Sequence, residues 1–169
     1  MLGPARAPVT LVEYGDFECS HCKRAAPVIK LLLRQYPRGL RAVFRHFPLE
    51  EVHPHALSAA LAAETAGAQG RFWAMHDLIF ETQAHLSLPQ LRRRAEALAL
   101  DMVRYDVEMH DAVYLQRVRE DIEGAKRSGV RATPTFFVNG RLIDVSYGFE
   151  ALHRTIGQEV AACLPAAGT

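Results

Sequence analysis

The stretch Asp16-Phe17-Glu18-Cys19-Ser20-His21-Cys22-Lys23-Arg24 carries two cysteines three positions apart, and its setting decides the fold. Such a pair suits a metal site, a structural disulfide or an electron-exchanging pair. Just before it, residues 9–14 form a short β-rich run that is apolar on both faces, as in a central strand. From the first cysteine to residue 36, apolar residues recur at helical spacing, so the pair is expected at a helix N-terminus.

The rest of the chain predicts a second strand over residues 40–47 and a helical block over residues 55–127. We expect about four helices in that block. Residues 135–138 and 141–145 flank Asn139-Gly140, which is the strongest short signal for a β-hairpin.

Three local signals refine these elements. Pro27 should kink the first helix, and Ser87 to Gln90 has the capping-box form with a proline in the first turn. A final helix should carry an apolar stripe, on which Cys163 would behave as a small hydrophobe. The stripe comprises Phe149, Leu152, Ile156, Val160 and Cys163.

The expected order is therefore a βαβ half, a helical block and a ββα half, which is an α/β chain. With a Cys-x-x-Cys at the start of the first helix and Thr133-Pro134 before the hairpin, the sequence resembles the thioredoxin fold. The helical insertion makes it similar to the DsbA-like branch. The resemblance implies a thioredoxin-like domain over residues 1–50 and 128–169, with an inserted helical domain over residues 51–127.

Other positions carry the same resemblance. Glu13 lies six residues before Cys19, where DsbA-like proteins have a buried acid, and Pro27 lies where thioredoxins have a kink proline. Residues 72–77 also resemble that branch, and Phe72-Trp73 is expected in the core. Ser20 departs from the pattern, because the best-known DsbA members have proline there.

Composition excludes several classes of protein. The 169 residues are 49% apolar, which suits one globular unit with a real core. The 20 basic and 19 acidic side chains give no reason to expect a nucleic-acid partner, and the run of arginines at 92–94 reads as a solvated helix face. Three cysteines are too few for a disulfide-stapled scaffold.

No apolar run approaches the ~18 residues of a membrane-spanning helix, and residues 1–8 lack the features of a secretory signal. We therefore expect no stable membrane insertion and a cytoplasmic location for the chain as written. A periplasmic or extracytoplasmic location applies if a leader was removed.

Thiol chemistry explains the cysteine pair. The thiolate is the attacking form, and an ordinary cysteine has a pKa of roughly 8.5. At a helix N-terminus, backbone N–H groups and the helix dipole stabilise the Cys19 anion. His21, Lys23 and Arg24 add positive charge or hydrogen-bond donors.

We assign Cys22 the resolving role, since it lies on the inner side of the first helical turn. Its proton has to be removed, and Glu13, an acid in an apolar strand, is placed to accept it directly or through water. The competing interpretation is that Glu13 only ends a strand and reaches solvent.

The resemblance implies a cis peptide bond at Thr133-Pro134, which would expose the Thr133 backbone to an extended substrate segment. The alternative is a trans proline that starts a strand.

A metal site is disfavoured. Cys19, His21 and Cys22 are zinc ligands in type, but no second Cys-x-x-Cys or His-x-x-x-His completes a tetrahedral set. No metal or cofactor is therefore expected. His53 and His55 read as loop residues, and His76 as a residue at a helix surface.

The sequence thus predicts a thiol-disulfide oxidoreductase that exchanges disulfides with protein cysteines, with a further redox partner to recycle the pair. His21 favours an oxidant, because stabilising the Cys19 thiolate stabilises the reduced form. The competing hypothesis is a redox-regulated binding module, in which the Cys19–Cys22 pair only switches a surface.

Overall fold

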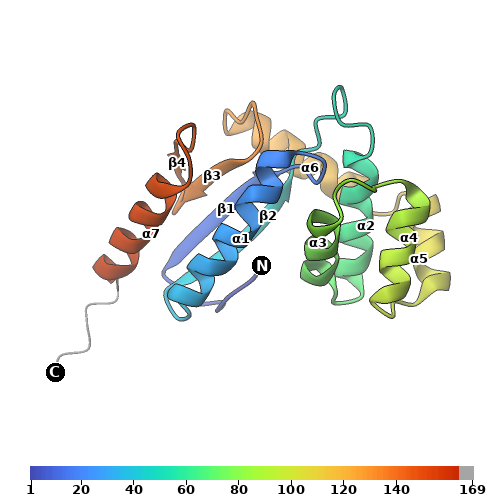
Figure 1. Cartoon of the computed structure of the whole chain (residues 1–169), viewed down its shortest axis with the longest axis horizontal. Helices are drawn as coiled ribbons and strands as arrows, with labels where there is room; N and C mark the ends of the chain where they lie inside the picture. Colours follow the sequence, from blue (N-terminus) through green and yellow to red (C-terminus); the bar gives the residue numbers. More distant parts are fainter. Residues whose placement is uncertain (164–169) are drawn as a thin grey trace.

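A computed structural model describes residues 1–163 of the chain. It contains one four-stranded sheet with helices packed against it, and a group of further helices at one end (Figure 1). In Figure 1, α1 crosses the near face of β1 and β2, and α7 lies beside β4.

The sheet has the strand order β2-β1-β3-β4. The central strand β1 (Val9–Gly15) pairs in parallel with β2 (Leu40–His46) and antiparallel with β3 (Thr135–Val138), which pairs antiparallel with β4 (Arg141–Ile143). Helix α1 (Ser20–Gln35) makes the crossover between the two parallel strands, as a parallel pair requires. This is the α/β thioredoxin fold that the sequence predicts, with each strand end within two residues of its expected place.

Helices α1 and α7 (Glu150–Cys163) bury one face of the sheet, on which every second strand residue is buried. Helix α6 (Leu115–Arg127) packs on the opposite face, where its Ala125 contacts Phe47 and Val130. The α1–α7 layer consists of Val9, Leu11, Ala25, Ile29, Leu32, Leu40, Ala42, Phe136, Val138, Ile143, Leu152, Ile156 and Val160.

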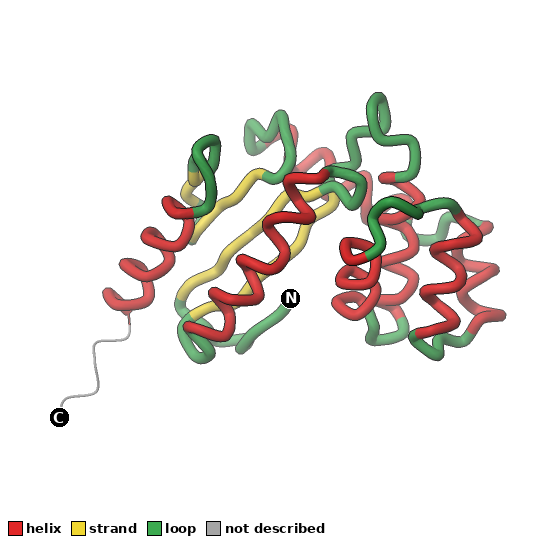
Figure 2. Tube along the Cα trace, in the orientation of Figure 1, coloured by secondary structure: helices red, strands yellow, loops and turns green. Residues whose placement is uncertain are grey.

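The helical block contains five helices rather than about four. They are α2 (Ala56–Ala68), α3 (Phe72–Glu81), α4 (Leu88–Ala97), α5 (Met102–His110) and α6. Helices α4 and α5 are separated by a short turn, in which Ala99 has a positive φ and Asp101 caps α5 by accepting the Arg104 N–H. Figure 2 shows α2 to α5 side by side with no strand among them.

Two local expectations turned out differently. Ser87 is the N-cap of α4 and a proline lies in its first turn, but no side-chain capping bond forms. Cys163 was wrongly placed on the apolar stripe of the final helix, because the buried stripe ends at Val160 and Cys163 is exposed. Pro27 lies inside α1 as expected.

The division into a thioredoxin-like domain and an inserted domain remains a prediction, and residues 164–169 of the first domain lie outside the described part of the chain. The inserted helices are joined to the sheet by polar contacts. The Asp121 carboxylate of α6 accepts bonds from the Arg45 guanidinium at 2.7 Å and from the His46 backbone N–H at 3.0 Å. Glu64 of α2 bonds the His46 ring at 2.9 Å.

The β3–β4 turn is the predicted hairpin turn. Asn139 and Gly140 have φ values of 48° and 81°, the positive pair that a type I′ turn requires. The Asn139 side chain accepts the Thr10 N–H, and the Asn139 N–H donates to the Thr10 carbonyl, both at 2.9 Å. The turn is thereby fixed to the central strand.

Replacing Gly140 with alanine should lower the free energy of unfolding by about 1 kcal/mol, because the positive φ strains any residue with a Cβ. No atom lies within 4 Å of the Cβ that would be added, so crowding does not contribute. Gly124→Ala, in the middle of α6 with its nearest neighbour 3.7 Å away, should instead stabilise by up to ~1 kcal/mol. Urea unfolding of both variants tests this, and an unchanged Gly140→Ala midpoint would contradict the strain argument.

Candidate active site

Cys19 is the N-cap residue of α1, directly after the turn that follows β1. Only 8% of its surface is exposed. The pKa of Cys19 is lowered to about 5, foremost by a hydrogen bond from the Cys22 side chain. The Thr133 side chain and the backbone N–H groups of Cys22 and His21 act in the same direction, while burial opposes them. Those two N–H groups are the ones that an N-cap side chain normally accepts from.

Cys22 has the opposite environment. It is fully buried, and the Asp16 backbone N–H donates to its sulfur at 3.4 Å. Burial raises the pKa of Cys22 above its ordinary value, with the nearby Cys19 and Glu13 adding to the effect. At neutral pH the pair therefore consists of an anionic outer sulfur and a protonated inner one.

The Thr133-Pro134 peptide bond is cis, as the resemblance implied. The Cys19 thiol donates to the Thr133 carbonyl oxygen at 3.3 Å, so the loop before β3 contacts the start of α1. The Thr133 hydroxyl is buried without a hydrogen-bond partner among the described residues, and it is therefore free to donate to the sulfur once the thiolate forms.

A groove opens beside this contact. Its walls come from the first turn of α1, the loop that contains the cis bond, β4 and the segment before α7. The lining residues are His21, Arg24, Ala132, Thr133, Pro134, Thr135, Leu142, Ile143, Asp144, Val145, Ser146, Gly148 and Phe149. The groove thus includes Thr133, whose carbonyl oxygen contacts the Cys19 sulfur.

Glu13 does not reach solvent, since only 3% of its surface is exposed. Its Oε1 atom has no hydrogen-bond partner among the described residues. Burial, and then the charge of Cys19, raise the pKa of Glu13 to about 8. An acid with such a pKa can both give and take a proton near neutral pH.

Two residues that sequence reasoning missed hold the loop in place. The buried Asp16 carboxylate accepts the N–H groups of Glu18 at 2.7 Å and Leu49 at 2.8 Å, and it also contacts the His53 ring at 2.8 Å. The Gln83 amide donates to the carbonyls of residues 17 and 19 at 2.9 Å each. Asp16 was visible as an acid at a strand end, but no sequence signal marked Gln83.

His76 was wrongly expected at a helix surface. Only 4% of it is exposed, and its ring lies among Phe17, Phe44, Trp73 and Phe80. Phe72 and Trp73 pack against the same cluster, partly buried.

The side chains of Ser20, His21, Lys23 and Arg24 are exposed. Within residues 1–163 the His21 imidazole has no hydrogen-bond partner, so the contact of His21 with Cys19 is made by its backbone N–H. Over the same residues, no group of three or more His, Cys, Asp or Glu side chains is arranged to hold a metal ion.

The family model described as thioredoxin matches residues 1–158. Among curated proteins, the chain is 49% identical over 154 residues to the Na(+)/H(+) antiporter NhaA 1 of Salinispora arenicola, covering 91% of this chain and 24% of the antiporter. The chain thus spans about a quarter of the length of the curated relatives that it matches.

Solved structures share the whole fold. BdbD from Bacillus subtilis, in its oxidised form, has a TM-score of 0.83 at 23% identity and covers 94% of this chain and 91% of its own. A thioredoxin-like oxidoreductase from Silicibacter pomeroyi scores 0.81 at 26% identity, covering 98% and 92%. DsbA2 from Pseudomonas aeruginosa scores 0.73 at 26% identity, covering 97% and 94%.

The cytoplasmic location expected from the sequence is wrong. The curated relatives are named as Na(+)/H(+) antiporters, which are membrane proteins, and DsbA works in the oxidising bacterial periplasm. The expectation had rested on the absence of a leader in residues 1–8. In the part of the chain that the structure describes, no helix has the length and apolarity needed to cross a bilayer.

The thiol titration should reveal the asymmetry of the pair. Cys19 should titrate with a pKa of about 5. The titration is measured by the thiolate absorbance near 240 nm or by the rate of alkylation at each pH. Cys22→Ala removes the strongest donor to that sulfur, so the Cys19 pKa should rise toward the ordinary value of ~8.5. Cys163→Ala, a change at an exposed and distant thiol, should leave the curve unchanged. An unshifted Cys19 in the parent would contradict the geometry.

Proposed function

The chain belongs to the thioredoxin family, and from that premise we propose that it is a DsbA-like oxidant that transfers disulfides to cysteines of other proteins. The observation that carries the proposal is the unequal pair of thiols at the start of α1, with an ionised Cys19 and a protonated Cys22. The likeness in fold to proteins named as an oxidoreductase and as DsbA2, at 26% identity, supports it.

In the oxidised protein, a substrate thiolate attacks the Cys19 sulfur. The Cys19–Cys22 bond breaks, a mixed disulfide forms at Cys19, and Cys22 leaves as a thiolate that takes the proton of Glu13. A second substrate thiolate then attacks the substrate sulfur of the mixed disulfide. The substrate gains a disulfide and Cys19 leaves as the stabilised thiolate.

This assignment makes Cys19 the nucleophile of the reduced form and Cys22 the resolving thiol. Glu13 moves the proton of Cys22. Thr133 and Pro134 hold the substrate, because the Thr133 backbone lies beside the Cys19 sulfur and opens onto the groove. Each round leaves the protein reduced, so a redox partner has to reoxidise it.

The stability of the Cys19 thiolate determines the direction of electron transfer, that is, whether the protein oxidises or reduces its substrates. A thiol with a pKa of about 5 is ionised at pH 7. Each tenfold gain in the stability of the reduced form raises the reduction potential by ~30 mV. Because the Cys19 pKa lies two units below pH 7, ionisation of Cys19 stabilises the reduced form about 100-fold, which corresponds to about 60 mV. The backbone donors of His21 and Cys22 thus favour an oxidant. A purely switching function has no need of such an activated sulfur, and the similar structures give it no support.

The partner is proposed from the curated relatives. A region similar to this chain lies within proteins named as Na(+)/H(+) antiporters. We therefore propose that this chain acts on cysteines of a membrane antiporter, or on cysteines of proteins that lie close to one.

Serine substitutions at the two cysteines should have different results. Cys19→Ser should abolish exchange with a reduced, unfolded protein. Cys22→Ser should retain attack and accumulate mixed disulfides at Cys19, because the resolving thiol is lost. Mass spectrometry of adducts formed with such a substrate, or with membranes that contain an antiporter, measures this. Adducts trapped on Cys19→Ser instead would reverse the assignment.

The reduction potential should lie clearly above the value of about −270 mV for thioredoxin. His21→Pro removes the backbone N–H that points at Cys19, so it should lower the reduction potential by a few tens of millivolts. A loss of ~30 mV corresponds to a tenfold change in the redox equilibrium constant. His21→Ala keeps that N–H and removes only the exposed imidazole, so it should stay within ~15 mV of the parent.

Equilibration against glutathione buffers, read by alkylation of the two thiols, gives these potentials. A parent value at or below that of thioredoxin would show a reductase. Equal potentials for His21→Pro and the parent would remove the backbone donor from the explanation.

A further inference from the structure

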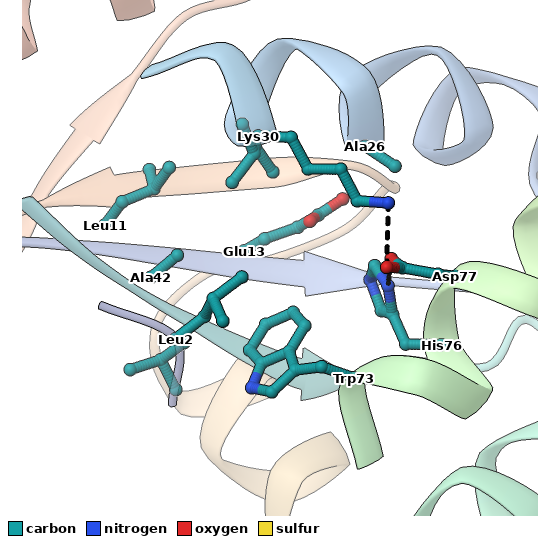
Figure 3. A pocket seen from close by; sticks show the side chains of 11 residues that line it. Leu2, Leu11, Glu13, Ala26, Lys30, Ala42, Trp73, His76 and Asp77 are labelled. Atoms are coloured by element: carbon teal, nitrogen blue, oxygen red, sulfur yellow. Dashed lines mark hydrogen bonds and ion pairs between the residues drawn. The ribbon is translucent and has the colours of Figure 1, made fainter. Parts of the chain in front are cut away.

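A narrow cavity lies between β1, β2, α1 and α3. Figure 3 shows the side chains of Glu13 from β1, of Lys30 from α1, and of His76 and Asp77 from α3 around it, with Lys30 reaching Asp77. The cavity has about 10 Å³ of space for the centre of a water-sized sphere, which is room for one water molecule. Its lining comprises Leu2, Leu11, Glu13, Ala26, Ile29, Lys30, Ala42, Val43, Trp73, His76 and Asp77.

Two buried polar atoms of this lining lack hydrogen-bond partners among the described residues. They are Oε1 of Glu13 and Nε2 of His76. A buried polar atom is costly unless it is paired, and a water with several polar partners is the usual way to pair it. One cavity thus contains two groups that both need a partner and has room for the water that would serve them.

The hydrogen bonds of His76 fix what its second nitrogen can do. The Nδ1 atom lies 3.0 Å from Oδ1 of Asp77. A carboxylate accepts, so Nδ1 carries the proton and donates, and the neutral ring keeps a lone pair on Nε2. His76 is therefore arranged to accept a proton on its inner nitrogen.

Asp77 continues this chain of groups to the surface. Its Oδ2 atom is 2.7 Å from Nζ of Lys30, and the two side chains are 31% and 37% exposed. The dashed lines in Figure 3 mark both contacts of the Asp77 carboxylate. The contacts of His76 with Asp77, and of Asp77 with Lys30, thus connect the wall of the cavity to the protein surface.

Resting on the proposed function, we propose that His76 is a positioning residue for proton transfer, which connects Glu13 to solvent through one water in this cavity and through Asp77. During reoxidation Cys22 attacks the Cys19 sulfur of a mixed disulfide. The new Cys19–Cys22 bond forms, the bond to the partner sulfur breaks, and the partner leaves as a thiolate.

The Cys22 proton passes to Glu13, while the proton already on Glu13 passes through the water to Nε2 of His76. The Nδ1 proton of His76 then leaves by way of Asp77. In the opposite direction, when Cys22 is released as a thiolate, the same groups return a proton.

The charges around Glu13 and His76 support this proton transfer. Glu13 faces Cys19 and Cys22, and its pKa of about 8 keeps it protonated at pH 7. It therefore cannot accept the Cys22 proton unless its own proton leaves. Burial lowers the pKa of His76 and, with Lys30 and the distant His46, outweighs the raising effect of Asp77. His76 is then neutral and able to accept.

The test follows the reduced protein after addition of oxidised glutathione, with acid quenching and mass spectrometry. The first step forms the Cys19–glutathione adduct and does not involve the Cys22 proton. The second is collapse of that adduct to the Cys19–Cys22 disulfide. His76→Gln and Asp77→Asn should slow the collapse at pH 7 by roughly tenfold, which is less than the loss of a direct general base. The first step should keep its rate.

The pH dependence separates this role from packing. At pH 9 Glu13 is itself ionised and accepts the Cys22 proton unaided, so both variants should approach the parent. Glu13→Gln should stay slow at both pH values. The matched control is His110→Gln, because His110 makes the same contact with the next residue, Asp111, at 2.9 Å but on an exposed surface.

Collapse at the parent rate in both variants at pH 7, or an equal slowing at pH 7 and 9, would overturn the proposal. A parent that forms no adduct at Cys19 would contradict the proposed function itself. The two failures are therefore distinct.

Discussion

The contact between the Cys19 sulfur and its surroundings is the interaction on which the rest of the structure depends. Cys19 is the N-cap residue of α1, and in the thiol form its S–H group donates a hydrogen bond to the Thr133 carbonyl, from the other half of the fold, at 3.3 Å. For these to meet, β1 and β3 have to be neighbours in the sheet. The hydrogen bonds of Asp16 and Gln83 then fix the loop between β1 and α1, which carries Cys19. These contacts thus help to place the Cys19 sulfur.

Burial raises the pKa of both thiols, but the outcome differs between them. A buried charge is unfavourable unless donors surround it. Cys19 has such donors, whereas Cys22 has one N–H and no exposed surface, so the same desolvation that keeps Cys22 protonated is overcome at Cys19. The proposed reaction moves a proton into and out of this region, and Glu13, whose buried Oε1 atom has no hydrogen-bond partner among the described residues, suits that role. Its high pKa is a consequence of the site and not an independent feature.

The sequence predicts the features that depend on local pattern. Alternation and helical spacing locate the strands and α1, and Asn139-Gly140 locates the turn, since each is determined by backbone preferences within a few residues. Sequence patterns do not predict the features that depend on contacts between residues far apart in the chain. Helical spacing around His76 does not show that the ring is buried, because Phe17 and Phe44, from other parts of the chain, pack against it together with Trp73 and Phe80 of its own helix. Gln83 likewise gains its role from two carbonyls more than sixty residues away. Cys163 was misplaced because helical spacing alone does not show where the covering sheet ends.

The two residues between the cysteines illustrate how the structure changes an argument drawn from side chains. The sequence predicts the imidazole of His21 as the partner of the thiolate, and Ser20 departs from the residue that the best-known DsbA members have. In the structure Cys19 is the N-cap residue of α1, and the backbone N–H groups of His21 and Cys22, the second and third residues of the helix, help to lower the pKa of its sulfur. Ser20 is the first residue of the helix, the position at which proline is readily accepted because its N–H is not needed. A serine in place of proline at this position therefore leaves the donors of the thiolate untouched, and the departure from the family pattern does not weaken the oxidant assignment.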